Sequence, residues 1–285
     1  MTSGLRNLTV IAAAAVAILV GWLVEVQAGE LRLFDLAHGK AVTESQALER
    51  LGGMRIVLVG EHHNNAEHHL AQFQVIRALH RAGRKVAVGL EMFRSHSQAD
   101  LDQWVAGGID EARFKAIYLD SWNFPWELYR PIFEYARRQK IVMVGLNVSR
   151  DITTQVAFHG FDSLTSAQKG DLEGVTCDVT GEYKAYIQRA YGAHGHGRMD
   201  FSRFCEAQLV WDTAMAMNAI AYVDSHPDSI LVILAGSGHA RKPGIPAQIA
   251  KRKSWPVAVL LPATADIFDA AHLSSQDADF LILNK

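Results

Sequence analysis

The sequence predicts an α/β fold, in which a mostly parallel sheet is flanked by helices and a helical insertion subdomain lies over the strand ends. Apolar runs rich in valine, isoleucine and leucine alternate with segments of helical periodicity, which is the order that parallel sheets require. The alternation stops from about residue 147 to residue 217, where only helical stretches and a glycine-rich loop are found. With 49% apolar and 20% charged residues, the chain has enough apolar side chains to bury a substantial core.

The first 28 residues differ from the rest of the chain. Arg6 precedes the uncharged, mostly apolar stretch Leu8–Val24, and Val26-Gln27-Ala28 follows. This order is typical of a secretory signal that is cleaved after Ala28. An uncleaved N-terminal anchor is the alternative, because the 17 residues of the apolar stretch are at the bottom of the range for a membrane span. We therefore expect residues 29–285 to be a single α/β domain that is periplasmic, or anchored to the membrane facing the periplasm.

Within this domain, strands and helices are expected to follow one another at short intervals. Residues 29–54 are a lead-in, in which Thr43 caps a helix that ends near Leu51. Asn64 or Asn65 can cap the next helix, and Gly83 can end it. Strands are expected at residues 55–60, 86–90, 141–146, from 230, at 257–261 and, as a last edge strand, at 280–283. Helices are expected at residues 66–82, 97–106, 111–118, 126–139, 202–224 and 246–252.

Charge and cysteine content narrow the classes of function. The net charge of −2 and the lack of a large basic cluster argue against nucleic acid as a partner. The two cysteines, Cys177 and Cys205, form either a disulfide or two unpaired thiols, and the sequence does not decide between these alternatives.

Two stretches read glycine, any two residues, then histidine, and each directly follows a predicted strand. They are Gly60-Glu61-His62-His63 and Gly236-Ser237-Gly238-His239, and a third predicted strand ends at Glu91. Polar residues at the carboxyl ends of strands in an open α/β sheet meet in one crevice, where ligands bind. Imidazole and carboxylate groups gathered in this way are suited to hold a divalent metal ion and to activate its bound water. The expected strand-end site consists of Glu61, His63, Glu91 and His239.

The motifs of several common enzyme classes are absent. The sequence has no His-Glu-x-x-His motif, no Gly-x-Ser-x-Gly nucleophile turn and no phosphate-binding loop that ends in Gly-Lys-Ser/Thr. We therefore do not expect a zincin, an α/β-hydrolase or a kinase.

A second group of side chains surrounds the glycine-rich loop at residues 192–197. It consists of Tyr183, Tyr186, Tyr191, His194, His196 and Met199. Tyrosine, histidine and methionine are side chains that ligate haem iron, so this group is a candidate haem site. A surface loop beside the aromatic side chains of a helical core is the alternative interpretation.

Together these motifs resemble the ChaN-like branch of the haem-binding-uptake/Tiki superfamily, over about residues 55–246. The matching positions are Gly60-Glu61-His62-His63, His68-His69 and Gln72, Leu90-Glu91-Met92-Phe93 with Gln98, Trp122, Trp126, Tyr129 and Pro131, Asn147, Phe204-Cys205-Glu206-Ala207-Gln208 with Trp211-Asp212, and Ala235-Gly236-Ser237-Gly238-His239 with Gly244-Ile245-Pro246. The resemblance implies an exported protein of haem or iron acquisition. It also implies a facing pair of haems between two protomers, with tyrosine as an iron ligand and histidine nearby. The chain departs from this pattern because it lacks a lipobox cysteine, which leaves lipid attachment to the outer membrane unsupported.

Two functions follow from the two groups of side chains. The first is a non-enzymatic haem-binding protein of haem uptake or trafficking, in which Tyr183 or Tyr186 ligates iron and His194 or His196 supports it. Its expected partners are haem, a second copy of the chain and outer-membrane haem-uptake machinery. The alternative is a metal-dependent hydrolase of the Tiki or erythromycin-esterase type, centred on the strand-end site. A structural envelope protein is a third interpretation, and it accounts least well for the complete strand-end site.

Overall fold

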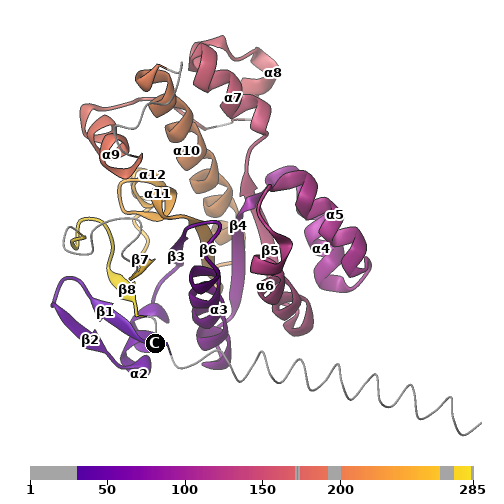
Figure 1. Ribbon diagram of the computed structural model, residues 1–285, viewed down its shortest axis with the longest axis vertical. Coiled ribbons are helices and arrows are strands. Elements are labelled where there is room, and N and C mark those ends of the chain that lie inside the picture. The colour runs from indigo at the N-terminus through magenta and orange to yellow at the C-terminus, as the bar shows by residue number, and fades with distance from the viewer. Residues whose placement is uncertain (1–30, 171, 173, 192–199, 264–272, 284–285) are drawn as a thin grey trace, which may run out of the picture. The chain divides into compact units, whose positions relative to one another are not determined.

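Eight strands form one sheet in the part of the chain that the structure describes (Figure 1). The computed structural model describes residues 31–283 except residues 171, 173, 192–199 and 264–272. The strands are β1 (Leu33–Asp35), β2 (Lys40–Val42), β3 (Ile56–Glu61), β4 (Val86–Arg94), β5 (Val142–Asn147), β6 (Ile230–Gly236), β7 (Val257–Pro262) and β8 (Phe280–Ile282). Their order in the sheet is β2-β1-β8-β7-β3-β6-β4-β5. Neighbours from β8 to β5 run parallel and β1 is antiparallel to β2 and β8, which confirms the predicted α/β class.

Two features of the sheet differ from the sequence prediction. The lead-in contains the hairpin of β1 and β2, and β8 lies between β1 and β7 instead of at an edge. Each hairpin strand is only three residues long, which is too short to show a period-two pattern. The turn between them is held by Asp35, whose carboxylate accepts hydrogen bonds from the amides of Ala37 and His38.

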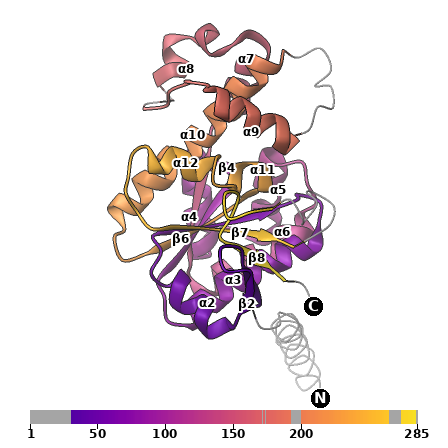
Figure 2. The same ribbon diagram turned by 90° about the vertical axis from the view of Figure 1, so that its left-hand side faces the viewer.

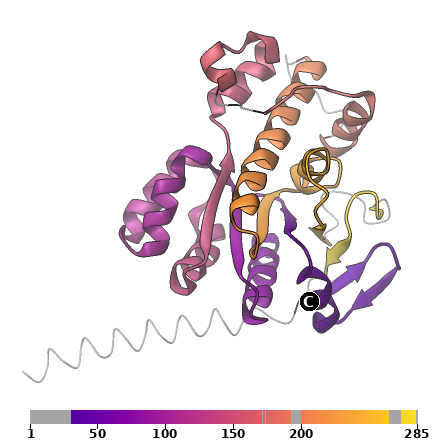
Figure 3. The ribbon, with the colours of Figure 1, turned by 180° about the vertical axis from the view of Figure 1, so that it is seen from behind.

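Helices cover both faces of the sheet. They are α2 (Glu44–Leu51), α3 (Ala66–Arg81), α4 (Gln98–Ala106), α5 (Glu111–Ser121), α6 (Trp126–Gln139), α7 (Arg150–His159), α8 (Ser166–Gly170), α9 (Gly181–Tyr191), α10 (Phe201–Ser225), α11 (Ser237–Ala240) and α12 (Ile245–Ala250). Helix α3 lies on one face (Figure 1) and α10 on the other (Figure 3). Because alternate residues of a strand face opposite sides, Ile56 and Leu58 of β3 share one core cluster with Met215 and Ile220 of α10.

The predicted starts of α2 and α3 are confirmed, and side-chain caps explain both. Thr43 and Gln46 form a capping box at α2. At α3 the side chain of Asn65 accepts a hydrogen bond from the amide of Glu67. Only four residues separate the end of β3 from the start of α3, so the histidines of the first turn of α3 lie close to the end of that strand.

Helices α7 to α10 lie between β5 and β6 in the chain, and Figure 2 shows α7, α8 and α9 beyond one end of the sheet. Two apolar clusters attach them to α10. One joins Val156 of α7 to Val210 of α10, and the other joins Tyr186 of α9 to Leu209 of α10. Helix α9 also contacts α11, the short helix that follows β6. The inserted helices therefore cover the carboxyl ends of the strands.

The two cysteines are free thiols in this structure. Cys205 is buried in the cluster of α9 and α10, and Cys177 packs against the same cluster. Burial raises the pKa of Cys177 to about 12 and that of Cys205 to about 11, so both thiols are protonated and poorly reactive at neutral pH.

The predicted export signal, residues 1–28, lies outside the described residues. Among the helices that the structure describes, none has both the length and the apolar character that a bilayer span requires.

Candidate functional site

The carboxyl ends of three adjacent strands open into a cleft of about 510 Å³. Strand β6 lies between β3 and β4, so the residues at the ends of these strands are neighbours. The cleft is lined by Glu61, His62, His63, Asn64, Glu91, Trp122, Phe124, Gln208, Trp211, Gly236, Ser237, Gly238 and His239. The structure thus brings all four residues of the predicted strand-end site into one cleft.

Glu61 lies at the centre of one half of the cleft and is almost fully buried. Its Oε1 lies 2.7 Å from Nδ1 of His63 and its Oε2 lies 3.2 Å from Nδ1 of His69. The hydroxyl of Tyr129 also donates a hydrogen bond to Oε1. Burial alone would raise the pKa of Glu61, but the hydrogen bonds from His63 and His69 outweigh it and hold this pKa well below its usual range. Glu61 is therefore a carboxylate at any physiological pH.

His63 presents its other ring nitrogen to the cleft. Burial opposes protonation of this ring, but the hydrogen bond to Glu61 and the charges of Glu91 and Glu61 raise its pKa. The ring packs against both Trp122 and Phe124, whose centroids lie 4.9 Å and 4.8 Å away. Since Nδ1 is bonded to Glu61, Nε2 is the nitrogen available to a ligand.

Gly236 allows the two halves of the cleft to approach each other. A Cβ atom at this position would lie 3.1 Å from Cε1 of His63 and 3.7 Å from Oε2 of Glu91. Its amide donates a hydrogen bond of 2.6 Å to Oε2 of Glu91. The close approach of His63 and Glu91 to the end of β6 therefore requires glycine at position 236.

His239 organises the other half of the cleft. Its Nδ1 lies 2.7 Å from Oδ1 of Asp212, and its Nε2 lies 3.8 Å from Oε1 of Glu91. Burial opposes protonation of His239, but the charges of Asp212 and Glu91 outweigh it and raise the pKa to about 9. His239 is therefore an imidazolium at neutral pH, with its proton on Nδ1 directed at Asp212.

The tyrosines of α9 are connected to this half of the cleft. The hydroxyl of Tyr183 donates a hydrogen bond of 2.6 Å to Oδ2 of Asp212, and that of Tyr186 donates to the carbonyl of Gly238. Both side chains are buried. The strand-end site and the tyrosines of α9, which are separate in the sequence, are thus connected by the hydrogen bonds of Tyr183 and His239 to Asp212.

The remaining members of the second group are not placed by the structure. His194, His196 and Met199 lie outside the described residues, as does the side chain of Tyr191. Their predicted role at the iron stays a prediction.

The predicted divalent metal site finds no support. Among the described residues, no three His, Cys, Asp or Glu side chains are arranged to hold a metal ion.

Asp212 and Tyr129 are the residues of the site to which the sequence assigned no role. Asp212 is a fully buried acid in the middle of α10, between Trp211 and Thr213. A single acidic residue in an otherwise apolar stretch of helix is the signal that would have identified it, because buried charges are normally paired.

The family model described as "Haem-binding uptake, Tiki superfamily, ChaN" matches residues 47–249 of the chain. The chain belongs to this family. The resemblance stated from the sequence motifs is therefore confirmed, and the matched region contains the complete strand-end site and the insertion.

The chain is similar to several solved structures, of which the first supports the fold. A structure of cofacial haem binding to ChaN of Campylobacter jejuni is 21% identical, has a TM-score of 0.70, and aligns over 90% of this chain and 97% of that chain. A mutant of the erythromycin esterase EreC in its open conformation is 17% identical, with a TM-score of 0.49 over 77% of this chain and 72% of that chain. The type III effector HopBA1 is 12% identical, with a TM-score of 0.49 over 84% and 91% of the two chains. No curated protein matches the sequence.

Proposed function

We propose that this member of the ChaN family is an exported haem-binding protein of haem or iron uptake and trafficking. The observation that carries the proposal is the aromatic-walled, histidine-bearing cleft at the strand ends, in a chain of a haem-binding-uptake family. The proposal places the protein in the periplasm or on the membrane that faces it, and it takes outer-membrane haem-uptake machinery as the partner.

The cleft has the shape and chemistry that a haem requires. Its volume of about 510 Å³ is within the range of roughly 300–1,000 Å³ typical of small-molecule sites. Trp122, Phe124 and Trp211 supply flat apolar walls. Apart from the 3.2 Å contact of Glu61 with His69, three buried atoms of the lining, Oε2 of Glu61, Oε1 of Gln208 and Oγ of Ser237, have no hydrogen-bond partner among the described residues, as is typical of a surface built to receive a ligand.

The iron ligand is proposed to come from the second group, from Tyr183 or Tyr186 with His194 or His196 beside it. Haem supplies a ferric iron that binds a tyrosinate as a strong anionic ligand. Burial, together with the charge of Asp212, raises the pKa of Tyr186 well above its usual value, so the free protein keeps this hydroxyl protonated. Neither tyrosine lines the cleft, so ligation requires the hydroxyl both to give up its present acceptor, Asp212 or Gly238, and to turn into the cleft. A homodimer with haem between the protomers completes the proposal.

The hydrolase alternative is not favoured. The described residues hold no metal-binding cluster that would activate water. Oγ of Ser237, at the end of β6, has no hydrogen-bond partner in the part of the chain that the structure describes, so no described base activates it.

The test is a titration of the purified protein with hemin, followed by absorbance in the Soret and charge-transfer regions. The wild type is expected to bind hemin with a tyrosinate-type ferric spectrum, and either Tyr183→Phe or Tyr186→Phe is expected to abolish that signature. Tyr222→Phe is the matched control, because Tyr222 stacks on His226 near the last turn of α10.

A wild type that gives no saturable Soret change refutes haem binding. If both single variants and the double variant keep the wild-type spectrum, the tyrosine assignment is wrong while haem binding stands.

A further inference from the structure

A second cavity of about 170 Å³ adjoins the strand-end cleft. Four residues line both cavities: Glu91, Trp122, Phe124 and Trp211. The smaller cavity is also lined by two arginines, Arg94 and Arg150. We propose that this cavity is a carboxylate subsite, in which the two arginines bind acidic groups of a ligand whose flat apolar body packs on the shared aromatic walls. The inference rests on the proposed function, and in haem the acidic groups are the two propionates.

The positive charges of Arg94 and Arg150 are not neutralised by ion pairs with described residues. Neither guanidinium forms an ion pair or a hydrogen bond with a described residue. Glu91 is the acidic residue that lines the cavity, and its carboxylate is already committed to Gly236 and His239 on the side of β6. The cavity therefore presents uncompensated positive charge beside an apolar cleft.

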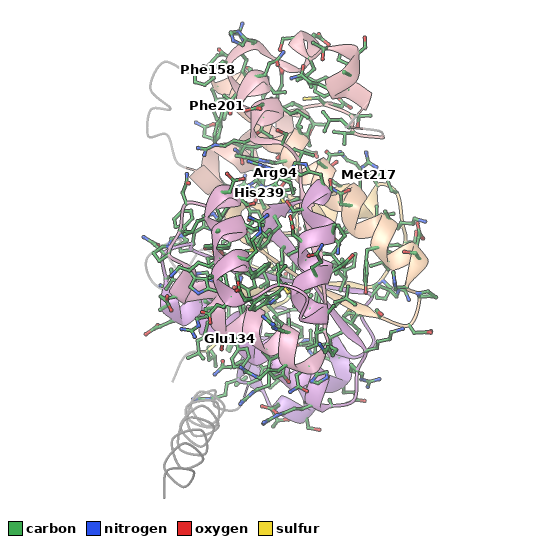
Figure 4. The ribbon with its side chains drawn as sticks, turned by 90° about the vertical axis from the view of Figure 1, so that its right-hand side faces the viewer. Arg94, Glu134, Phe158, Phe201, Met217 and His239 are labelled. Atoms are coloured by element: carbon green, nitrogen blue, oxygen red, sulfur yellow. The ribbon has the colours of Figure 1, made fainter. Side chains whose placement is uncertain are left out.

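The backbone of β4 brings Arg94 to this position. Leu90 pairs with Gly145 and Arg94 pairs with Asn147, so β4 advances by four residues while β5 advances by two. Such bulges redirect side chains beside binding sites. Gly145 makes the bulge possible, because a Cβ atom there would lie 2.4 Å from the carbonyl oxygen of Arg94. Figure 4 shows Arg94 and His239 toward the same end of the fold, near the inserted helices.

The chemistry of the two side chains suits a carboxylate. Arg94 is half-buried and Arg150 is exposed, so one guanidinium is partly desolvated and the other meets a ligand from solvent. A guanidinium can bind a carboxylate by two parallel hydrogen bonds, which are stronger when water is partly excluded. Arg94 also borders a third cavity, but there the charges of Asp100 and Asp120 offset those of Arg94 and Arg113.

The experiment compares each acid with its ester. The wild type, Arg94→Gln, Arg150→Gln and the double variant are titrated with hemin and with hemin dimethyl ester, in which both propionates are masked. A second probe without iron, 1-pyrenebutyrate against its methyl ester, is followed by fluorescence. Arg32→Gln, an exposed arginine just before β1, controls for the loss of a positive charge.

The wild type is expected to bind each acid roughly 10-fold or more tightly than its ester, and the double variant is expected to lose this preference. Affinity for the esters should be unchanged, which also shows that the variants are folded. A double variant that keeps the preference overturns the subsite and leaves haem binding intact. A wild type that prefers pyrenebutyrate to its ester but does not bind hemin overturns the proposed function. In that case the subsite is tested by whether the arginine variants lose the preference for pyrenebutyrate. No preference for the acid with either probe overturns the subsite.

Discussion

Replacing Asp212 by asparagine removes one negative charge from the buried pair with His239 and keeps a side chain of the same size. The amide oxygen can still accept the hydrogen bond from His239, while the amide NH2 takes the place of the oxygen that accepts from Tyr183, so the change removes the charge and one acceptor without changing the size of the side chain. In the folded protein the pKa of His239 is raised from 6.5 to about 9, and Asp212 is the larger of the two charges that raise it. Asparagine at this position is therefore expected to lower the pKa of His239.

The size of the effect follows from linkage between protonation and folding. A pKa unit corresponds to about 1.36 kcal/mol, so the shift of His239 contributes at most about 3 kcal/mol to the free energy of unfolding. Because the folded-state pKa is the higher one, this contribution is fully present below pH 6.5 and is lost as the pH rises toward about 9. Because Glu91 supplies part of the shift, Asp212→Asn should destabilise the protein by up to about 3 kcal/mol at pH 6 and by much less at pH 9.

The assay is urea unfolding of wild type and variant at pH 6, 7.5 and 9, with the same buffer ions throughout. Asp224→Asn is the control, since Asp224 is an exposed acid near the end of the same helix and pairs with Lys253 on the surface. It should change stability by less than about 1 kcal/mol at every pH. Parallel stability profiles for Asp212→Asn and wild type from pH 6 to pH 9 would refute the assignment of His239 as an imidazolium held by Asp212.

Three further predictions test other parts of the structure. Gly236→Ala should weaken hemin binding and destabilise the fold by about 1–3 kcal/mol, because the added Cβ would lie 3.1 Å from the His63 ring. Gly170→Ala is the control, because a Cβ there has no atom within 4 Å, and it should leave hemin titrations unchanged. Tyr129→Phe should lower the free energy of unfolding by about 1–3 kcal/mol, because Glu61 loses a buried donor; an unchanged urea midpoint would contradict this role. Export predicts a mature chain that starts at Gly29, and N-terminal sequencing of protein from the periplasmic fraction checks it; a cytosolic chain that starts at Met1 would exclude cleavage.

The parts of the fold that the sequence predicted are those with strong local signals. The central strands β3, β6 and β7 are runs of buried branched residues, and the starts of α2 and α3 have capping side chains. Because parallel strand ends meet in one crevice, the positions of the four strand-end residues also followed from the sequence.

The contacts that the sequence did not predict depend on distant partners. Asp212 and His239 are 27 residues apart, and no local pattern joins a residue of a long helix to one beyond the next strand. A helical core around Tyr183 and Tyr186 was the alternative interpretation, but the acceptors of their hydroxyls, Asp212 and Gly238, were not predicted, because both are distant in the sequence. Strand β8 was predicted but misplaced, because its partner β1 is too short to be recognised.

The position of β8 has a consequence for the order in which the sheet is completed. Strand β1 is the first described strand to leave the ribosome, yet one of its two neighbours, β8, is the last. Until β8 is made, the hairpin of β1 and β2 has no place to dock on the parallel strands, and an isolated hairpin is only marginally stable in water. We therefore expect the hairpin to stay undocked until β8 is synthesised, and if the predicted signal directs export, the segment that follows it would still be extended when it meets a translocation channel.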